Sequence, residues 1–301
     1  MTNKAEGETH QTGMTAGQRV AVIVHVFYLD IWPEVAISIK NLVAAAGGGA
    51  VVFATYPAGR CDIAEAIATV FPKAVVRPVS NIGWDVWPFF SVLNDLELSD
   101  WDLIVKLHTK RNVDSMWINF RRFLKPDGWR KALLSFCDSV NVARRSLLAF
   151  AAQPKLGMIA GERVIDAYGY GMGRSIKDCE KILESIGLSS RKGAVVWGTM
   201  WMVRAHLLKP FWRRWTESDF PVPATRNPHA GYGLAGDCEV LFGLLVCAQG
   251  YFVSSGRLPQ GLAVAHYWMK LCAFRILRGV CQFLRRFIPA DSGYINNETL
   301  R

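Results

Sequence analysis

Polar side chains gather at two places in this 301-residue chain where a folded sheet would end. One is the segment from Asp102 to Lys110, DLIVKLHTK, whose alternating apolar residues give way to polar ones. Such alternation is typical of a β-strand. His108, Thr109 and Lys110, followed by Arg111, would then lie at the carboxyl end of the strand, where open α/β sheets bind their ligands. We therefore predict a polar pocket at this edge.

The second place is the loop from Asn81 to Asp85, NIGWD, which precedes an aromatic segment that we predict to be a helix. Gly83 gives the loop conformational freedom, and Asp85 lies near the first helical turn. The Asp85 carboxylate is suited to hold a ribose, base or sugar hydroxyl. Alternatively, Asn81 and Asp85 only cap the helix, as these residue types often do. The residues alone leave both interpretations open.

The basic groups after the predicted strand suit a phosphorylated ligand. Lys110 and Arg111 match a diphosphate, and His108 can also donate a hydrogen bond. The alternative is a solvated basic loop. The D-x-D string at residues 100–102 resembles a metal motif, but it precedes the strand and so falls at the opposite edge, where we interpret it as a turn. No other carboxylate pair follows a strand, so the residues give no positive evidence for a metal site.

Two further candidates lie in the second half of the chain. Asp237 and Glu239 stand at the start of a predicted helix, whose dipole keeps an acid ionised and suits a general base. Helix capping is the alternative. Trp201, in the segment GTMWMVR, offers a ring for stacking on a sugar or base, or it packs in the core. His25 stands alone in the sequence and is expected to be structural.

The pattern of apolar residues predicts an α/β fold in which strands alternate with helices around a parallel sheet. The expected strands are 20–26, 51–55, 74–79, 102–108, 157–160 and 251–254. The expected helices are 29–46, 62–70, one from 85, 115–124, 129–151, 177–186 and 237–248, and 195–204 looks like a strand entering another helix.

Composition bounds the class of protein. Half of the residues are hydrophobic and 12% are aromatic, which indicates a folded globular chain. The seven cysteines form no CxxC pair, which favours a reducing compartment and argues against zinc. Residues 1–18 are polar and are expected to form a disordered tail, without the apolar segment of a signal peptide. No window of about 18 uncharged apolar residues predicts a transmembrane helix.

The net charge of +10 implies an acidic partner. Part of it lies in the segment 263–301, where a predicted helix carries arginines on one narrow face and apolar residues on the rest, as a helix in a bilayer interface does. The alternative is a core-packed helix with a solvated basic edge. Nucleic acid is not expected, because most aromatic residues lie within apolar runs. The arginines of this face are Arg275, Arg278, Arg285 and Arg286.

Three segments together resemble the rhamnan synthesis protein F family of bacterial polysaccharide glycosyltransferases. They are Asn81–Phe89, Asp102–Lys110 and Gly198–Arg204. The resemblance covers roughly residues 20–255 and implies a GT-A-like fold, a mostly parallel sheet flanked by helices, to which the residue pattern adds a C-terminal amphipathic helix. Residues 19–262 would form the glycosyltransferase-like domain, with 19–112 as the nucleotide-sugar-binding half, 113–262 as the acceptor half, and 263–301 as the basic helix and tail.

The same resemblance implies transfer of a hexosyl group from a nucleotide-sugar, with dTDP-rhamnose as a candidate donor, to a cell-surface polysaccharide or lipid-linked glycan. A second likeness, of Asp237–Glu239 with Gly250-Tyr251 to the late acidic motif of inverting GT-A glycosyltransferases, implies an inverting reaction in which Asp237 is the base and Glu239 assists it or holds the acceptor. The implied substrate-binding residues are Asn81, Gly83, Asp85, His108, Thr109, Lys110, Arg111 and Trp201. The alternative is a non-catalytic nucleotide-sugar or glycan-binding module with the same fold.

The likeness to GT-A enzymes also bears on the metal. These enzymes commonly carry a D-x-D motif at the strand end where this chain has His108 to Lys110, so the sequence does not support a dedicated Mg²⁺ or Mn²⁺ site. The basic C-terminal helix, together with a lipid-linked acceptor, implies a cytoplasmic location, peripheral on the inner face of the bacterial cell membrane, with an anionic membrane surface as a partner.

Overall fold

The structure is a computed structural model and describes residues 17–111, 128–167, 175–189, 193–220 and 233–255. Three predicted features lie outside these residues: the helix at 115–124, the amphipathic helix within 263–301, and nearly all of the tail at 1–18. In the described part, no helix is long and apolar enough to cross a bilayer.

A mixed sheet of seven strands forms the centre of the described fold, in the order β3-β2-β1-β4-β8-β5-β9. All neighbouring strands are parallel except β8, which runs antiparallel to both β4 and β5. The prediction of a mostly parallel, GT-A-like sheet is therefore confirmed. The strands are β1 (Val20–His25), β2 (Ala50–Pro57), β3 (Val75–Val79), β4 (Leu103–His108), β5 (Leu156–Ala160), β8 (Trp201–Arg204) and β9 (Phe252–Ser254).

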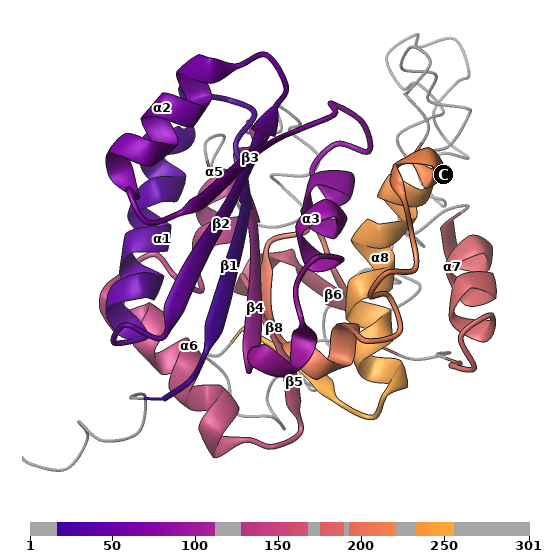
Figure 1. Cartoon of the computed structure of the whole chain (residues 1–301). Coiled ribbons are helices and arrows are strands. Elements are labelled where there is room, and N and C mark those ends of the chain that lie inside the picture. Colours follow the sequence, from indigo (N-terminus) through magenta and orange to yellow (C-terminus); the bar gives the residue numbers. More distant parts are fainter. Residues whose placement is uncertain (1–16, 112–127, 168–174, 190–192, 221–232, 256–301) are drawn as a thin grey trace, which may run out of the picture.

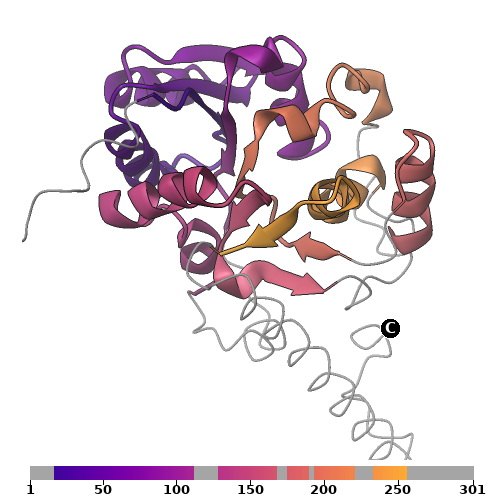
Figure 2. The same cartoon turned by 90° about the horizontal axis from the view of Figure 1, so that it is seen from below.

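Helices cover both faces of this sheet (Figure 1). On one side lie α1 (Trp32–Ala45), α2 (Cys61–Val70) and α6 (Val140–Ala152), and on the other lie α3 (Val86–Leu93) and α8 (Gly233–Ala248). This double cover explains why every residue of β1 and β4 is buried. Helix α7 (Ser175–Glu184) packs on the outer side of α8, away from the sheet (Figure 2).

Two segments differ from the sequence prediction. The single helix expected over 129–151 is two helices, α5 (Gly128–Leu134) and α6, because Ser139 adopts an extended backbone and its hydroxyl accepts a hydrogen bond from the Val142 amide. The segment 195–204 contains two strands instead of one. The first, β7 (Ala194–Val196), forms a small antiparallel ribbon with β6 (Ile165–Ala167), a strand that the sequence analysis missed.

An aromatic cluster fills the space between the sheet, α3 and α8. Trp201 of β8 is fully buried, and its ring lies 5.4 Å from that of Phe89 and 4.8 Å from that of Phe242. These neighbours cover the indole, so Trp201 supports the core and does not offer the open stacking surface that was expected of it.

Candidate functional site

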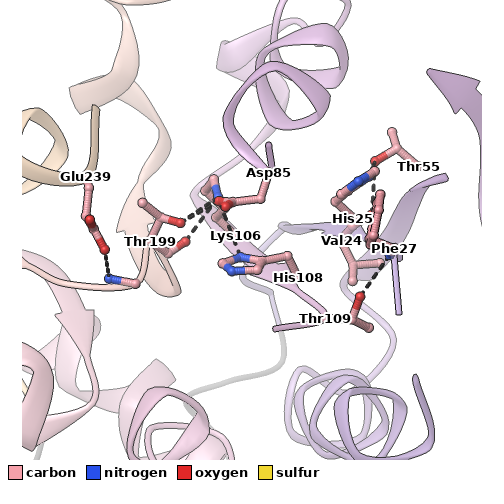
Figure 3. A network of polar contacts seen from close by, with 11 residues as sticks. Val24, His25, Phe27, Thr55, Asp85, Lys106, His108, Thr109, Thr199 and Glu239 are labelled. Carbon is pink, nitrogen blue, oxygen red and sulfur yellow. Dashed lines mark hydrogen bonds and ion pairs between the residues drawn. The ribbon is translucent and has the colours of Figure 1, made fainter. Parts of the chain in front are cut away.

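Polar residues from β4 and from the start of α3 meet at the carboxyl edge of the sheet. Lys106 and His108 are two residues apart on β4, so both side chains point to the same face. Asp85, immediately before α3, lies over that face (Figure 3). Its Oδ2 atom forms an ion pair with Lys106 Nζ and lies 3.4 Å from His108 Nδ1. The Asp85 side chain makes no capping bond to its helix, so the structure does not support the interpretation that Asp85 only caps α3.

Thr199 joins this group because β8 runs antiparallel to β4. The amino end of β8 therefore lies at the carboxyl edge of β4, where Trp201 is paired with Lys106. Lys106 Nζ donates to the carbonyl oxygen of Thr199 at 3.2 Å and to its Oγ1 at 3.1 Å, and Thr199 Oγ1 donates to Asp85 Oδ2 at 2.5 Å. We call Asp85, Lys106, His108 and Thr199 the inner cluster.

The turn that carries Thr199 is strained. Gly198 and Thr199 have φ values of 80° and 51°, and a β-branched residue in the left-handed region is an outlier. Glu239 of α8 stabilises this turn, because its Oε1 atom accepts a hydrogen bond from the Gly198 amide at 2.6 Å. Glu239 thus links α8 to the inner cluster through the backbone (Figure 3).

Burial and charge together set the ionisation of the inner cluster. Burial acts to raise the pKa of Asp85, but the basic groups of His108, Lys106 and Lys110 outweigh it and hold the pKa well below its ordinary value. Burial lowers the pKa of Lys106, which Asp85 opposes. Burial also lowers the pKa of His108 well below 6.5, so its imidazole is neutral at neutral pH. The charges of Asp85 and Lys106 cancel, so the inner cluster carries no net charge.

A second histidine lies beside the inner cluster. In the parallel pairing of β1 with β4, His25 stands directly opposite His108, although it appeared isolated in the sequence. Its Nδ1 atom lies 3.0 Å from Thr55 Oγ1. Burial lowers the pKa of His25 to about 4, with Asp85 opposing.

The residues after β4 have separate roles. The hydroxyl of Thr109 accepts hydrogen bonds from the amides of Phe27 and Tyr28, at 2.8 and 2.9 Å, so it positions the loop after β1. Lys110 is partly buried. Arg111 is exposed, with its guanidinium 4.6 Å from the centre of the Tyr28 ring and 3.9 Å from Asp30.

The loop before α3 holds Asp85 in place. Gly83 has a φ of 58°, and a Cβ there would lie 2.8 Å from the Phe220 ring and 2.9 Å from Trp87, so the position requires glycine. Trp84 follows with a φ of 54° and is 45% exposed. Asn81 is exposed and away from the contacts of the inner cluster.

The described residues do not provide a metal-binding cage. In these parts of the chain, no three His, Cys, Asp or Glu side chains come together as ligands. The Asp85 carboxylate already has the Lys106 ammonium against it, where a cation would bind. The Asp100 to Asp102 string lies at the opposite edge as predicted, with Asp102 Oδ2 accepting from the Arg19 amide at 2.7 Å.

The two predicted acids occupy different positions on α8. The helix begins at Gly233, four residues earlier than expected, so Asp237 lies in its second turn and does not cap it. Asp237 is partly exposed, and its backbone carbonyl lies 3.6 Å from Cys179 Sγ of α7. Glu239 contacts the turn that carries Thr199, because its Oε1 atom accepts from the Gly198 amide.

Sequence reasoning missed Lys106 and Thr199 as site residues. A signal for Lys106 was present, because a lysine within an otherwise apolar strand is buried only with a partner. No signal marked Thr199, whose position depends on the direction of β8.

The fold and the inner cluster define a GT-A-like α/β protein with a polar site at the carboxyl edge of its sheet. The sequence model of the family described as rhamnan synthesis protein F matches residues 1–229, and the chain belongs to this family. Membership implies a role in rhamnan synthesis, with a nucleotide-sugar donor and a glycan acceptor. The match includes the inner cluster and ends before Asp237 and Glu239. A search of the curated proteins finds no match.

The two buried histidines predict an acid-sensitive fold. Below the unfolded-state pKa of about 6.5, the unfolded chain binds protons that neutral His25 and His108 do not. The free energy of unfolding therefore decreases as the pH is lowered, by about 1.4 kcal/mol per pH unit for each histidine. For His25 this loss continues until pH reaches its folded pKa of about 4. Urea unfolding at pH 7, 6 and 5 measures it. His25→Asn keeps a donor for Thr55 and should reduce the slope, whereas a stability that is unchanged between pH 7 and 5 would contradict the assignment.

Proposed function

We propose that this chain is a glycosyltransferase that moves a sugar, with rhamnose as the first candidate, from a nucleotide-sugar to a cell-surface polysaccharide or lipid-linked glycan. The observation that carries the proposal is the inner cluster at the carboxyl edge of a GT-A-like sheet. Four polar side chains from three elements converge there, and a buried charge pair with shifted pKa values is typical of a functional site. Family membership supports the same class of reaction.

In the proposed reaction, a hydroxyl oxygen of the acceptor attacks the anomeric carbon of the donor sugar. The bond from that carbon to the diphosphate oxygen breaks, and its electron pair leaves with the diphosphate. Lys110 and Arg111 supply positive charge where the leaving group develops its negative charge. Asp237 takes the proton of the acceptor hydroxyl in this scheme. Attack opposite to the leaving group inverts the anomeric centre.

The first test is turnover by the full chain with dTDP-rhamnose and a rhamnan oligosaccharide, measured as released dTDP, with and without EDTA. We expect dTDP release that depends on the oligosaccharide and largely survives EDTA, because the Lys106 ammonium lies against the Asp85 carboxylate where a metal ion would have to bind. UDP-glucose serves as the comparison donor. Complete loss in EDTA that Mg²⁺ restores would contradict the metal-free scheme. Binding without any turnover would instead support a non-catalytic nucleotide-sugar-binding module.

The two acids of α8 should respond differently to amide substitution. Asp237→Asn removes the proposed proton acceptor and should lower turnover by about 10²–10⁴-fold with little change in donor affinity. Glu239→Gln keeps an oxygen that can accept from the Gly198 amide, so we expect near-normal turnover and stability. The reverse result, with Asp237→Asn active and Glu239→Gln inactive, would make Glu239 the base.

We also propose that the basic C-terminal helix holds the protein at the inner face of the bacterial membrane, where a lipid-linked acceptor is available. The support is the sequence pattern alone. Full-length protein should sediment with vesicles that contain anionic lipid, and less so as salt is added. Changing all four arginines of the basic face to glutamine should abolish sedimentation, while lysine at the same positions should preserve it. Equal binding of the glutamine variant would exclude this face as the anchor. The four positions are Arg275, Arg278, Arg285 and Arg286.

A further inference from the structure

The His108 imidazole has an unusual environment. The residue is 3% exposed, and within the described residues neither ring nitrogen has a hydrogen-bond partner. One nitrogen, Nδ1, lies 3.4 Å from Asp85 Oδ2, beyond an ordinary hydrogen bond but close enough for a strong electrostatic effect. The other, Nε2, has no such neighbour among these residues.

Asp85 determines which nitrogen of His108 carries the proton. A neutral imidazole has one N–H donor and one bare acceptor, and an ionised carboxylate only accepts. If Nδ1 were bare, its lone pair would face the negative Asp85 carboxylate and be repelled. The proton therefore resides on Nδ1, and Nε2 is a buried acceptor. Leaving a buried acceptor without a donor costs free energy, so this atom needs an explanation, and a hydroxyl group supplied by a ligand at this polar edge is one.

We propose that His108 Nε2 accepts a hydrogen bond from a sugar hydroxyl, so that the inner cluster recognises sugar and the diphosphate binds outside it. This inference rests on the proposed function and refines it. It also revises the expectation that His108 donates to the diphosphate, because a bare Nε2 has no proton to give, and an ionised diphosphate oxygen has none to offer in return.

The distribution of charge supports the same division. Within the inner cluster, the Asp85 carboxylate offsets the Lys106 ammonium, so a diphosphate gains little there. Further positive charge lies beyond the end of β4, on partly buried Lys110 and on exposed Arg111, whose 3.9 Å ion pair with Asp30 is open to water and therefore weak.

Two substitutions at His108 separate the ring nitrogens. Asparagine places an amide near the position of Nδ1 and removes Nε2, whereas glutamine places its terminal oxygen near Nε2. Calorimetry with dTDP, dTDP-rhamnose and a rhamnan oligosaccharide then distinguishes the sources of the hydroxyl. We expect His108→Asn to weaken one of the two sugar ligands about tenfold, as loss of one hydrogen bond does, with dTDP unchanged and with partial recovery in His108→Gln. The sugar ligand that weakens identifies the donor or the acceptor as the source.

Three results would overturn the inference. Equal weakening of dTDP and dTDP-rhamnose would assign His108 to the diphosphate. Unchanged binding of both sugar ligands would mean that an internal water satisfies Nε2. A proton on Nε2 in the ¹⁵N NMR spectrum of the wild-type imidazoles would refute the tautomer, and this measurement needs no variant to fold.

Failure of the wild type to bind any probe would instead count against the proposed function. Lys110→Gln tests that part separately, because it should weaken dTDP binding in a salt-dependent way.

Discussion

The buried contact between Lys106 and Asp85 is the interaction on which the carboxyl edge of this fold depends. A buried ammonium or carboxylate costs several kcal/mol unless it is paired and hydrogen-bonded, and removing one partner of such a pair typically costs about 3–5 kcal/mol. Here the pair joins the middle of the sheet to a loop that follows β3, three strands away in the sheet order. Thr199 adds a hydroxyl and a carbonyl from a third element. The pair thus fixes where the loop, β4 and the start of β8 meet.

The backbone around this pair carries strain that the pair compensates. Trp84 and Thr199 both have positive φ values, and each such residue costs on the order of 1–3 kcal/mol. Trp84 directly precedes Asp85, and Thr199 bonds to both members of the pair. A strained conformation persists only where its surroundings over-determine it. The contacts of Asp85 and Lys106 hold Trp84 and Thr199 in these conformations, and the hydrogen bond from the Gly198 amide to Glu239 also holds the turn at Thr199.

The sequence was sufficient for features that depend on neighbouring residues and insufficient for those that depend on pairing across the chain. Both β1 and β4 are fully buried, which requires mostly apolar residues along each strand. These apolar runs were sufficient to identify the two strands from the sequence. The pairing of His25 with His108 depends on register between strands 83 residues apart in sequence, which no local pattern encodes. Trp201 was ambiguous for the same reason: a single aromatic residue does not show whether Phe89 and Phe242 will cover it.

The same distinction explains why net charge was a weak guide to the site. A charge of +10 suggested a phosphorylated or membrane partner, but it could not show which cations are already neutralised inside the protein. Lys106 forms an ion pair with Asp85, and Arg130 forms one with Glu34 at 2.6 Å, so the charge of each is already offset within the protein. Among the described residues, Lys110 and Arg111 follow the inner cluster at the outer end of β4, and the Arg111 ion pair with Asp30 is long and exposed. A neutral interior beside a cationic exterior suits a ligand that is itself divided, with a hydroxyl-bearing ring on one side and a charged diphosphate on the other, and a nucleotide-sugar has this composition.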